Sequence, residues 1–198
     1  MSSIEGCIQI GCTDDAEAEV CSASHVGGSS SDRYLVINNI SKIKNITNLC
    51  LIAGACNFCV LFVQPSETTL EETVRSSFLA CRNLSVQHLV FSTLEEMKTY
   101  LVGKQIPLVG IEIMETAISM KAFNYEQKRG IAFMPGNEGM GLTPKQKNVC
   151  SHFMYIPQFG AGTASLNVNL ATSIVLNDYC SRVSLSLTKE DHDNQVNI

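Results

Sequence analysis

The sequence predicts an α/β fold in which helices cover both faces of a mostly parallel sheet. Short runs of β-branched and other apolar residues alternate with helix-forming segments along the chain, a pattern typical of parallel sheets. Two of these runs break directly into glycine-rich loops, as strands do where ligands bind at their carboxyl ends. The 198 residues, 45% of them hydrophobic and 17% charged, suffice for one domain with its own core.

Six apolar runs are predicted to be strands, and helices are predicted between and after them. The strands are residues 34–40, 59–63, 86–91, 107–113, 131–134 and 153–156. The helices are residues 45–56, 70–79, 94 to about 102, a helix starting at Pro144, and 165 to about 182. Two helix starts carry capping signals. Thr93 stands three residues before Glu96, the spacing of a capping box. Thr143 precedes Pro144, so threonine is the expected N-cap and proline takes the first helical position.

The two ends of the chain differ in composition from its middle. Residues 1–33 hold six acidic side chains and one basic, show no sustained period and include a Gly/Ser/Asp run. Residues 183–198 hold three acidic side chains and one basic. We therefore predict disordered acidic tails at 1–32 and 183–198 around one domain at 33–182. The segment 34–182 carries a net charge of only +2, so charge alone gives little support to RNA binding.

Cysteine usage and hydropathy indicate a reducing compartment. The nine cysteines are scattered, several lie inside apolar runs, and no signal peptide precedes them. No apolar run reaches the roughly 18–20 residues of a membrane span. The Cys56–Cys59 pair lacks a second pair at zinc spacing, and the four histidines show no ligand spacing, so no metal is expected. A cytoplasmic protein is predicted, with a nuclear location as an alternative.

The strongest motif signal lies between residues 131 and 180. The strand 131–134 runs into GNEGMGLT, residues 136–143, and about fifteen residues later the strand 153–156 runs into IPQFGAGTASLNV, residues 156–168. A lone glycine-rich loop would be a weak signal, but two loops with a fixed polar set between them are specific. In order and spacing they resemble the second and third motifs of the SpoU family of RNA ribose 2′-O-methyltransferases, of the SPOUT superfamily.

This resemblance implies a trefoil knot, a bound S-adenosyl-L-methionine, an RNA substrate (tRNA or rRNA) and a homodimer. It implies that Gly136, Ile156 and Leu166 contact the cofactor, largely through backbone groups. It places Asn45, Glu138, Ser165 and Asn167 around the substrate ribose. A turn glycine at 136 and a helix cap at Ser165 are the structural alternatives, whereas an asparagine inside a first helical turn, as expected for Asn167, favours a functional role.

The first motif of the family departs from its pattern in this chain. Asn45, Leu49 and Ala53 match it, but Leu51 stands where the family has an arginine held to bind RNA phosphate and to help activate the ribose hydroxyl. Leucine can do neither. Two hypotheses follow: an RNA ribose 2′-O-methyltransferase in which another arginine substitutes (Arg33, Arg75, Arg82, Arg129 or one from a partner), or a catalytically inactive relative that binds cofactor or RNA as an interaction or regulatory subunit.

Overall fold

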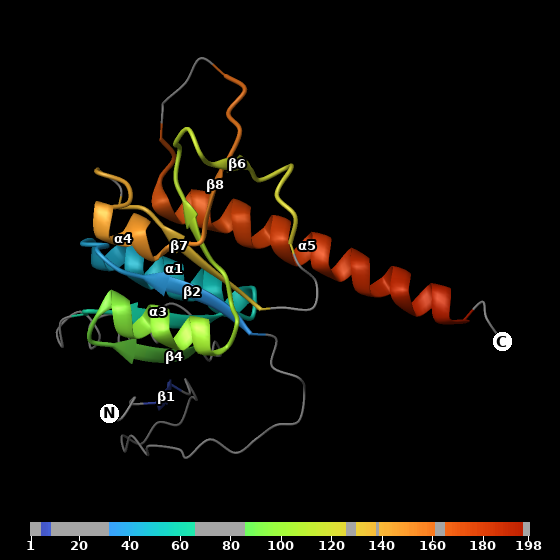
Figure 1. Ribbon diagram of the computed structural model, residues 1–198, viewed down its shortest axis with the longest axis horizontal. Coiled ribbons are helices and arrows are strands. Elements are labelled where there is room, and N and C mark those ends of the chain that lie inside the picture. The colour runs from blue at the N-terminus through green and yellow to red at the C-terminus, as the bar shows by residue number, and fades with distance from the viewer. Residues whose placement is uncertain are drawn as a thin grey trace, which may run out of the picture.

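A computed structural model describes residues 5–8, 32–65, 86–125, 130–137, 139–160 and 165–195 of the protein, and side chains at 32–65, 86–125, 130–137, 139–160 and 165–183. Eight strands in these ranges form one sheet in the order β1-β4-β3-β2-β7-β5-β8-β6 (Figure 1). The strands are β1 (Glu5–Ile8), β2 (Arg33–Ile37), β3 (Cys59–Val63), β4 (Val86–Phe91), β5 (Leu108–Ile111), β6 (Ile118–Ser119), β7 (Ile131–Pro135) and β8 (His152–Tyr155). The pairing is parallel except between β1 and β4, so the predicted mostly parallel sheet is confirmed.

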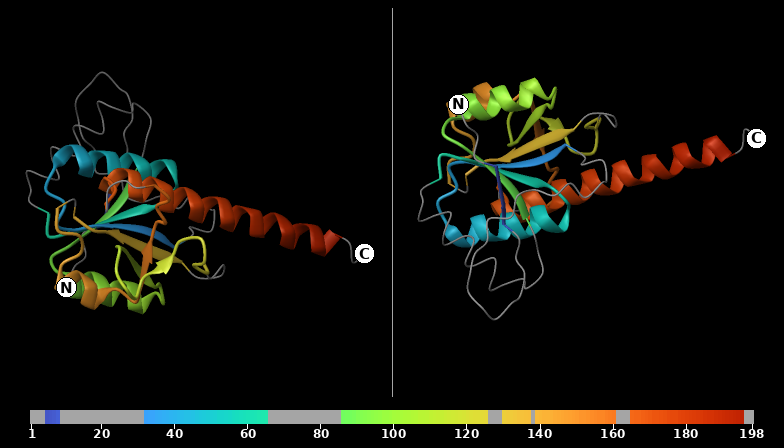
Figure 2. Two further views of the ribbon diagram at one scale, coloured as in Figure 1. Left: turned by 90° about the horizontal axis from the view of Figure 1, so that it is seen from above. Right: turned by 90° about the horizontal axis from the view of Figure 1, so that it is seen from below.

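Helices cover both faces of this sheet, as predicted. The described helices are α1 (Ile43–Ala55), α3 (Leu94–Gly103), α4 (Pro144–Val149) and α5 (Val168–Gln195). Figure 2 shows α1 and α5 on one face, and α3 and α4 on the other. Alternate residues of each strand therefore enter different cores. On β2, Leu35 packs in the core that includes Leu49 of α1, and Val36 packs in the core that includes Met97 of α3.

Both predicted N-caps are confirmed, but the reciprocal capping box forms only at α4, because the Glu96 side chain accepts from the Ser92 N–H and not from Thr93. The Thr93 side chain accepts a hydrogen bond from the Glu96 backbone N–H. At α4, the Thr143 and Gln146 side chains form a reciprocal capping box around Pro144. The predicted helix at 70–79 lies outside the described residues, and the knot implied by the family resemblance stays a prediction.

The structure differs from the sequence prediction at both ends of the chain. Helix α5 continues to Gln195, so its predicted end near Arg182 is too early, and residues 183–195 are helical where a disordered tail was expected. The physical reason is that neither glycine nor proline occurs between Val168 and Gln195 to end the helix. Residues 5–8, within the other predicted tail, pair with β4 as strand β1. Within the described ranges, no helix combines the length and apolar character needed to span a membrane.

Candidate functional site

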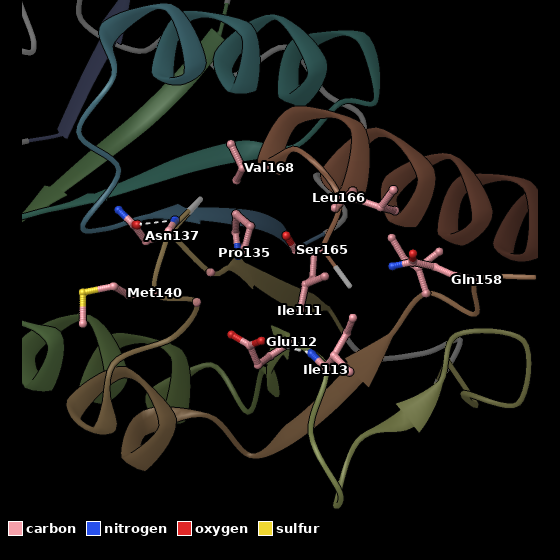
Figure 3. A pocket seen from close by; sticks show the side chains of 15 residues that line it. Ile111, Glu112, Ile113, Pro135, Asn137, Met140, Gln158, Ser165, Leu166 and Val168 are labelled. Atoms are coloured by element: carbon pink, nitrogen blue, oxygen red, sulfur yellow. Dashed lines mark hydrogen bonds between the residues drawn. The ribbon is translucent and has the colours of Figure 1, made fainter. Parts of the chain in front are cut away.

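A cavity of about 410 Å³ lies at the carboxyl ends of β5 and β7 (Figure 3). Four segments form its wall: the end of β5, the loop after β7, the segment after β8, and the start of α5. Its lining residues are Ile111, Glu112, Ile113, Pro135, Gly136, Asn137, Gly139, Met140, Gly141, Ile156, Gln158, Ser165, Leu166, Val168 and Ala171. The volume falls in the range of about 300–1,000 Å³ that is usual for small-molecule sites, and the position is the usual one in parallel α/β sheets.

The loop after β7 is held in shape by its own backbone and by Asn137. The backbone N–H of Asn137 donates to the Gly141 carbonyl over 3.1 Å, and that of Gly141 donates back over 2.9 Å. The Asn137 side chain accepts from the Gly139 N–H at 2.9 Å and donates to the Asn39 carbonyl at 2.7 Å. These bonds close the loop on itself and attach it to the segment that follows β2.

Glu112 joins this loop to the end of β5. Its Oε2 accepts a 2.7 Å hydrogen bond from the Leu142 N–H, and its Oε1 accepts one of 3.1 Å from the Ile113 N–H. The carboxylate fills the space beside two glycines. A Cβ on Gly136 would lie 2.9 Å from the Gly141 backbone and 3.0 Å from Glu112 Oε2, and a Cβ on Gly141, where φ is +65°, would lie 2.1 Å from that oxygen. Close packing inside the wall thus requires glycine at both positions, whether or not a ligand also approaches the backbone there.

The structure brings four of the predicted site residues together. Gly136, Ile156, Ser165 and Leu166 all line the cavity. Ser165 is exposed, while Ile156 and Leu166 are half-buried. The predicted roles of these residues are not tested by their placement and stay predictions.

Asn45 and Asn167 are not among the lining residues of the cavity. Asn45 is 7% exposed in the first turn of α1, where its Oδ1 accepts a 2.9 Å hydrogen bond from Asn169 Nδ2. Asn167 immediately precedes α5, and its Oδ1 accepts from the Asn169 N–H at 2.9 Å. The expectation that Asn167 lies inside the first helical turn was therefore wrong: it caps the helix, for which asparagine is a favoured residue. Glu138, the remaining predicted site residue, lies outside the described residues.

Sequence reasoning missed Glu112, Asn137 and Gln158 as lining residues of the cavity. Asn137 is part of the motif that was recognised, so only its role was overlooked. Glu112 directly follows the buried strand β5, and a polar residue in that position is the signal that could have identified it.

Of the four arginines proposed as substitutes for the missing one, the structure describes Arg33, which does not line the cavity. Arg33 begins β2 and pairs in register with Ile131, whereas the cavity begins at Pro135, about 13 Å further along the sheet. The Arg33 guanidinium lies 5.4 Å from the centre of the Tyr179 ring. Arg75, Arg82 and Arg129 lie outside the described residues. Leu51 is half-buried on α1.

Among the described side chains, no group of three or more His, Cys, Asp or Glu residues is arranged to hold a metal ion. Cys56 and Cys59, the closely spaced pair in the sequence, form no disulfide within the described residues. The expected absence of a metal stays a prediction.

The fold and the cavity together define a mostly parallel α/β domain with a cavity of small-molecule size at the carboxyl edge of its sheet. The model of the SpoU rRNA Methylase family matches residues 32–177, and the chain belongs to that family. The resemblance in the sequence motifs is thus confirmed. Among curated proteins, none matches this chain.

Several solved structures share the fold. One is a putative RNA methyltransferase of the TrmH family from Porphyromonas gingivalis, with a TM-score of 0.66, 19% identity, and coverage of 77% of this chain and 61% of that one. Another is the SpoU methyltransferase AviRb from Streptomyces viridochromogenes in complex with AdoMet, with a TM-score of 0.64, 18% identity, and coverage of 79% and 60%. An AdoMet-bound rRNA methyltransferase from Sinorhizobium meliloti has a TM-score of 0.63, 18% identity, and coverage of 78% and 57%. This chain therefore spans about three fifths of the length of these proteins.

Proposed function

We propose that the cavity binds S-adenosyl-L-methionine and that the protein is a ribose 2′-O-methyltransferase acting on tRNA or rRNA. The observation that carries this proposal is the convergence of Gly136, Ile156, Ser165 and Leu166, all taken from two family motifs, on one cavity. Family membership supports it, and so do two relatives of the same fold whose structures hold AdoMet.

The residues of the cavity fit this cofactor. Ile111, Ile156 and Val168 offer apolar surface for a purine ring. The glycine-containing loop brings backbone N–H and C=O groups to the wall, and the Gln158 and Ser165 side chains add polar groups at the exposed side. When bound, S-adenosyl-L-methionine would supply an electrophilic methyl group. The chain itself would contribute mainly orientation of the two reactants.

The described cavity residues provide no clear general base to remove the proton from the ribose hydroxyl. Glu112 is the only ionisable side chain among the described lining residues, and both of its oxygens already accept backbone N–H groups. Ser165 can orient a hydroxyl group but is not a base. Activation of the ribose hydroxyl therefore requires a group beyond these residues, such as Glu138 or an arginine from a second copy in the predicted homodimer.

Leu51 favours a second candidate function. An inactive family member would keep the cavity and bind cofactor or RNA as an interaction or regulatory subunit. The half-buried leucine on α1, together with the placement of Arg33 away from the cavity, supports this alternative.

Cofactor binding is tested first, by calorimetric titration with S-adenosylhomocysteine. Ala171 lines the cavity, and Ala171→Trp should fill it and abolish binding, whereas Leu170→Trp, at a neighbouring residue that is 51% exposed and is not a lining residue, should leave binding unchanged. Gly136→Leu should also abolish binding, because its side chain collides with the Gly141 backbone. A folded wild-type protein that binds neither S-adenosylhomocysteine nor S-adenosyl-L-methionine would contradict the proposal.

Methyl transfer is tested next, with labelled cofactor and unmodified tRNA and rRNA, comparing the wild type with Leu51→Arg. Ribose methylation would be located by resistance of the modified linkage to alkaline hydrolysis. Activity in the wild type supports the enzyme. Activity only in Leu51→Arg supports an inactive protein with an otherwise competent site. Cofactor binding without activity in either protein favours the regulatory alternative. Light scattering checks the proposed homodimer, and imaging of the tagged protein checks the proposed cytoplasmic location.

A further inference from the structure

Glu112 is the one charged side chain among the described residues that line the cavity. The others are apolar side chains, glycines and neutral polar groups, and no described lining residue carries a positive charge. None of the described side chains forms an ion pair with this carboxylate, so its charge acts on whatever ligand occupies the cavity.

The carboxylate is held by the loop after β7 and by the next residue of its own segment. The Leu142 N–H comes from the loop after β7, and the Ile113 N–H from the segment after β5. In Figure 3 the Glu112 side chain extends toward the loop that carries Asn137 and Met140. The same side chain therefore holds one wall of the cavity and places a negative charge in it.

The hydrogen bonds do not use all the acceptor capacity of this group. A carboxylate has about four lone-pair sites, and the Leu142 and Ile113 N–H groups occupy one on each oxygen. Glu112 also belongs to the cavity wall. Its charge and its remaining acceptor sites favour a ligand that carries positive charge.

We propose that Glu112 is the specificity-determining residue of the cavity and makes it prefer the cationic S-adenosyl-L-methionine over the neutral S-adenosylhomocysteine. This inference rests on the proposed function. The two ligands differ by one methyl group and one positive charge, since the first is a sulfonium and the second a thioether. A fixed negative charge discriminates between the two ligands. Packing and hydrogen bonding to the parts that the ligands share cannot do so. The reaction product would then be held less tightly than the substrate.

The test is a comparison of two affinities, measured by calorimetry for each ligand in the wild type and in Glu112→Gln. The substitution keeps the size of the side chain and removes its charge. We expect the preference for S-adenosyl-L-methionine to fall by about tenfold, for a charge pair several ångströms apart in a cavity that opens to solvent. An equal loss of affinity for both ligands would mean that Glu112 only supports the cavity wall. Unchanged affinities for both ligands would mean that Glu112 does not contact the bound ligand. Both results overturn the proposal.

Three further variants separate charge from position. Glu112→Asp keeps the charge but shortens the side chain, so both ligands should bind more weakly while the ratio of their affinities stays near the wild-type value. A ratio that falls as in Glu112→Gln contradicts the proposal. This variant also serves as the test if Glu112→Gln does not fold. Gly141→Ala pushes a Cβ against the carboxylate and displaces it, so both ligands should weaken and the preference for S-adenosyl-L-methionine should fall. Glu115→Gln, at an exposed position that is not a lining residue, should leave both affinities unchanged. Absence of binding in the folded wild type would instead refute the proposed function, so the two failures are distinguishable.

Discussion

The side-chain amide of Asn169 donates a 2.9 Å hydrogen bond to Oδ1 of Asn45 and so joins the first turn of α5 to the first turn of α1. Asn45 is 7% exposed, and Oδ1 of Asn169 is buried without a hydrogen-bond partner among the described residues. The same Asn169 donates its backbone N–H to the Asn167 side chain. Two residues predicted to surround the ribose are therefore connected through a third, just beyond the residues that line the cavity.

This pair should be energetically coupled. Replacing Asn45 or Asn169 by alanine leaves the other amide buried with one partner fewer, which costs about 1–2 kcal/mol of unfolding free energy. The double variant should lose less than the sum of the two single variants, by about 0.5–1.5 kcal/mol. Urea unfolding of the four proteins measures this cycle, with Asn177→Ala at an exposed position of α5 as control. Strict additivity would mean that the bond contributes nothing to stability.

Gln146 carries a second buried polar connection, between α4 and the segment that follows β2. It is fully buried, its Oε1 accepts from the Thr143 N–H at 2.8 Å, and its Nε2 donates to the Asn38 carbonyl at 3.2 Å. Gln146→Met keeps the volume but leaves both backbone groups without this partner, so we expect a loss of about 2–3 kcal/mol in urea unfolding. Asn148→Ala, at an exposed position of the same helix, should change stability by less than about 0.5 kcal/mol. Similar stabilities of the two variants would contradict this role of Gln146.

Features that depend on contacts between residues close in sequence could be predicted, and features that depend on contacts between distant residues could not. Strands and capped helices follow from short-range patterns, and the Thr143 capping box needs only residues three apart. The Asn45–Asn169 bond joins residues 124 positions apart in sequence, and the contact of Glu112 with Leu142 spans 30. Such contacts depend on which strands become neighbours, and no periodic pattern encodes that. The predicted end of α5 is wrong because a shift to polar, acidic composition does not end a helix when no helix-breaking residue is present.

Arg182 should stabilise the segment that follows β6. Its guanidinium donates to the Met120 carbonyl at 2.9 Å and to the Phe123 carbonyl, and lies 4.4 Å from the centre of the Tyr125 ring. Because a lysine ammonium lacks the planar fork, Arg182→Lys should lose several of these contacts and about 1–3 kcal/mol of stability.

The location of that loss can be measured by amide hydrogen exchange. The Ala122 and Phe123 amides donate to the Ser119 carbonyl in the native structure, and both should exchange faster in Arg182→Lys than in the wild type. Ser181→Ala, at the exposed neighbouring position, should leave their exchange unchanged. Unaltered protection of these two amides in Arg182→Lys would show that the guanidinium does not hold the segment.

His88 should make the protein less stable as the solution is acidified. Burial lowers the pKa of His88 below its ordinary value, and its Nδ1 is buried without a partner among the described residues. In the unfolded chain histidine takes up a proton at a pKa of about 6.5. Between that pKa and the lower folded-state pKa, the unfolded state binds more protons than the folded state, so stability falls with falling pH. Urea midpoints at pH 7.5 and 5.5 should therefore differ more in the wild type than in His88→Leu. His152→Gln, at an exposed position, should retain the wild-type difference. An identical pH dependence in the wild type and His88→Leu would mean that His88 is protonated as readily in the folded protein as in the unfolded chain.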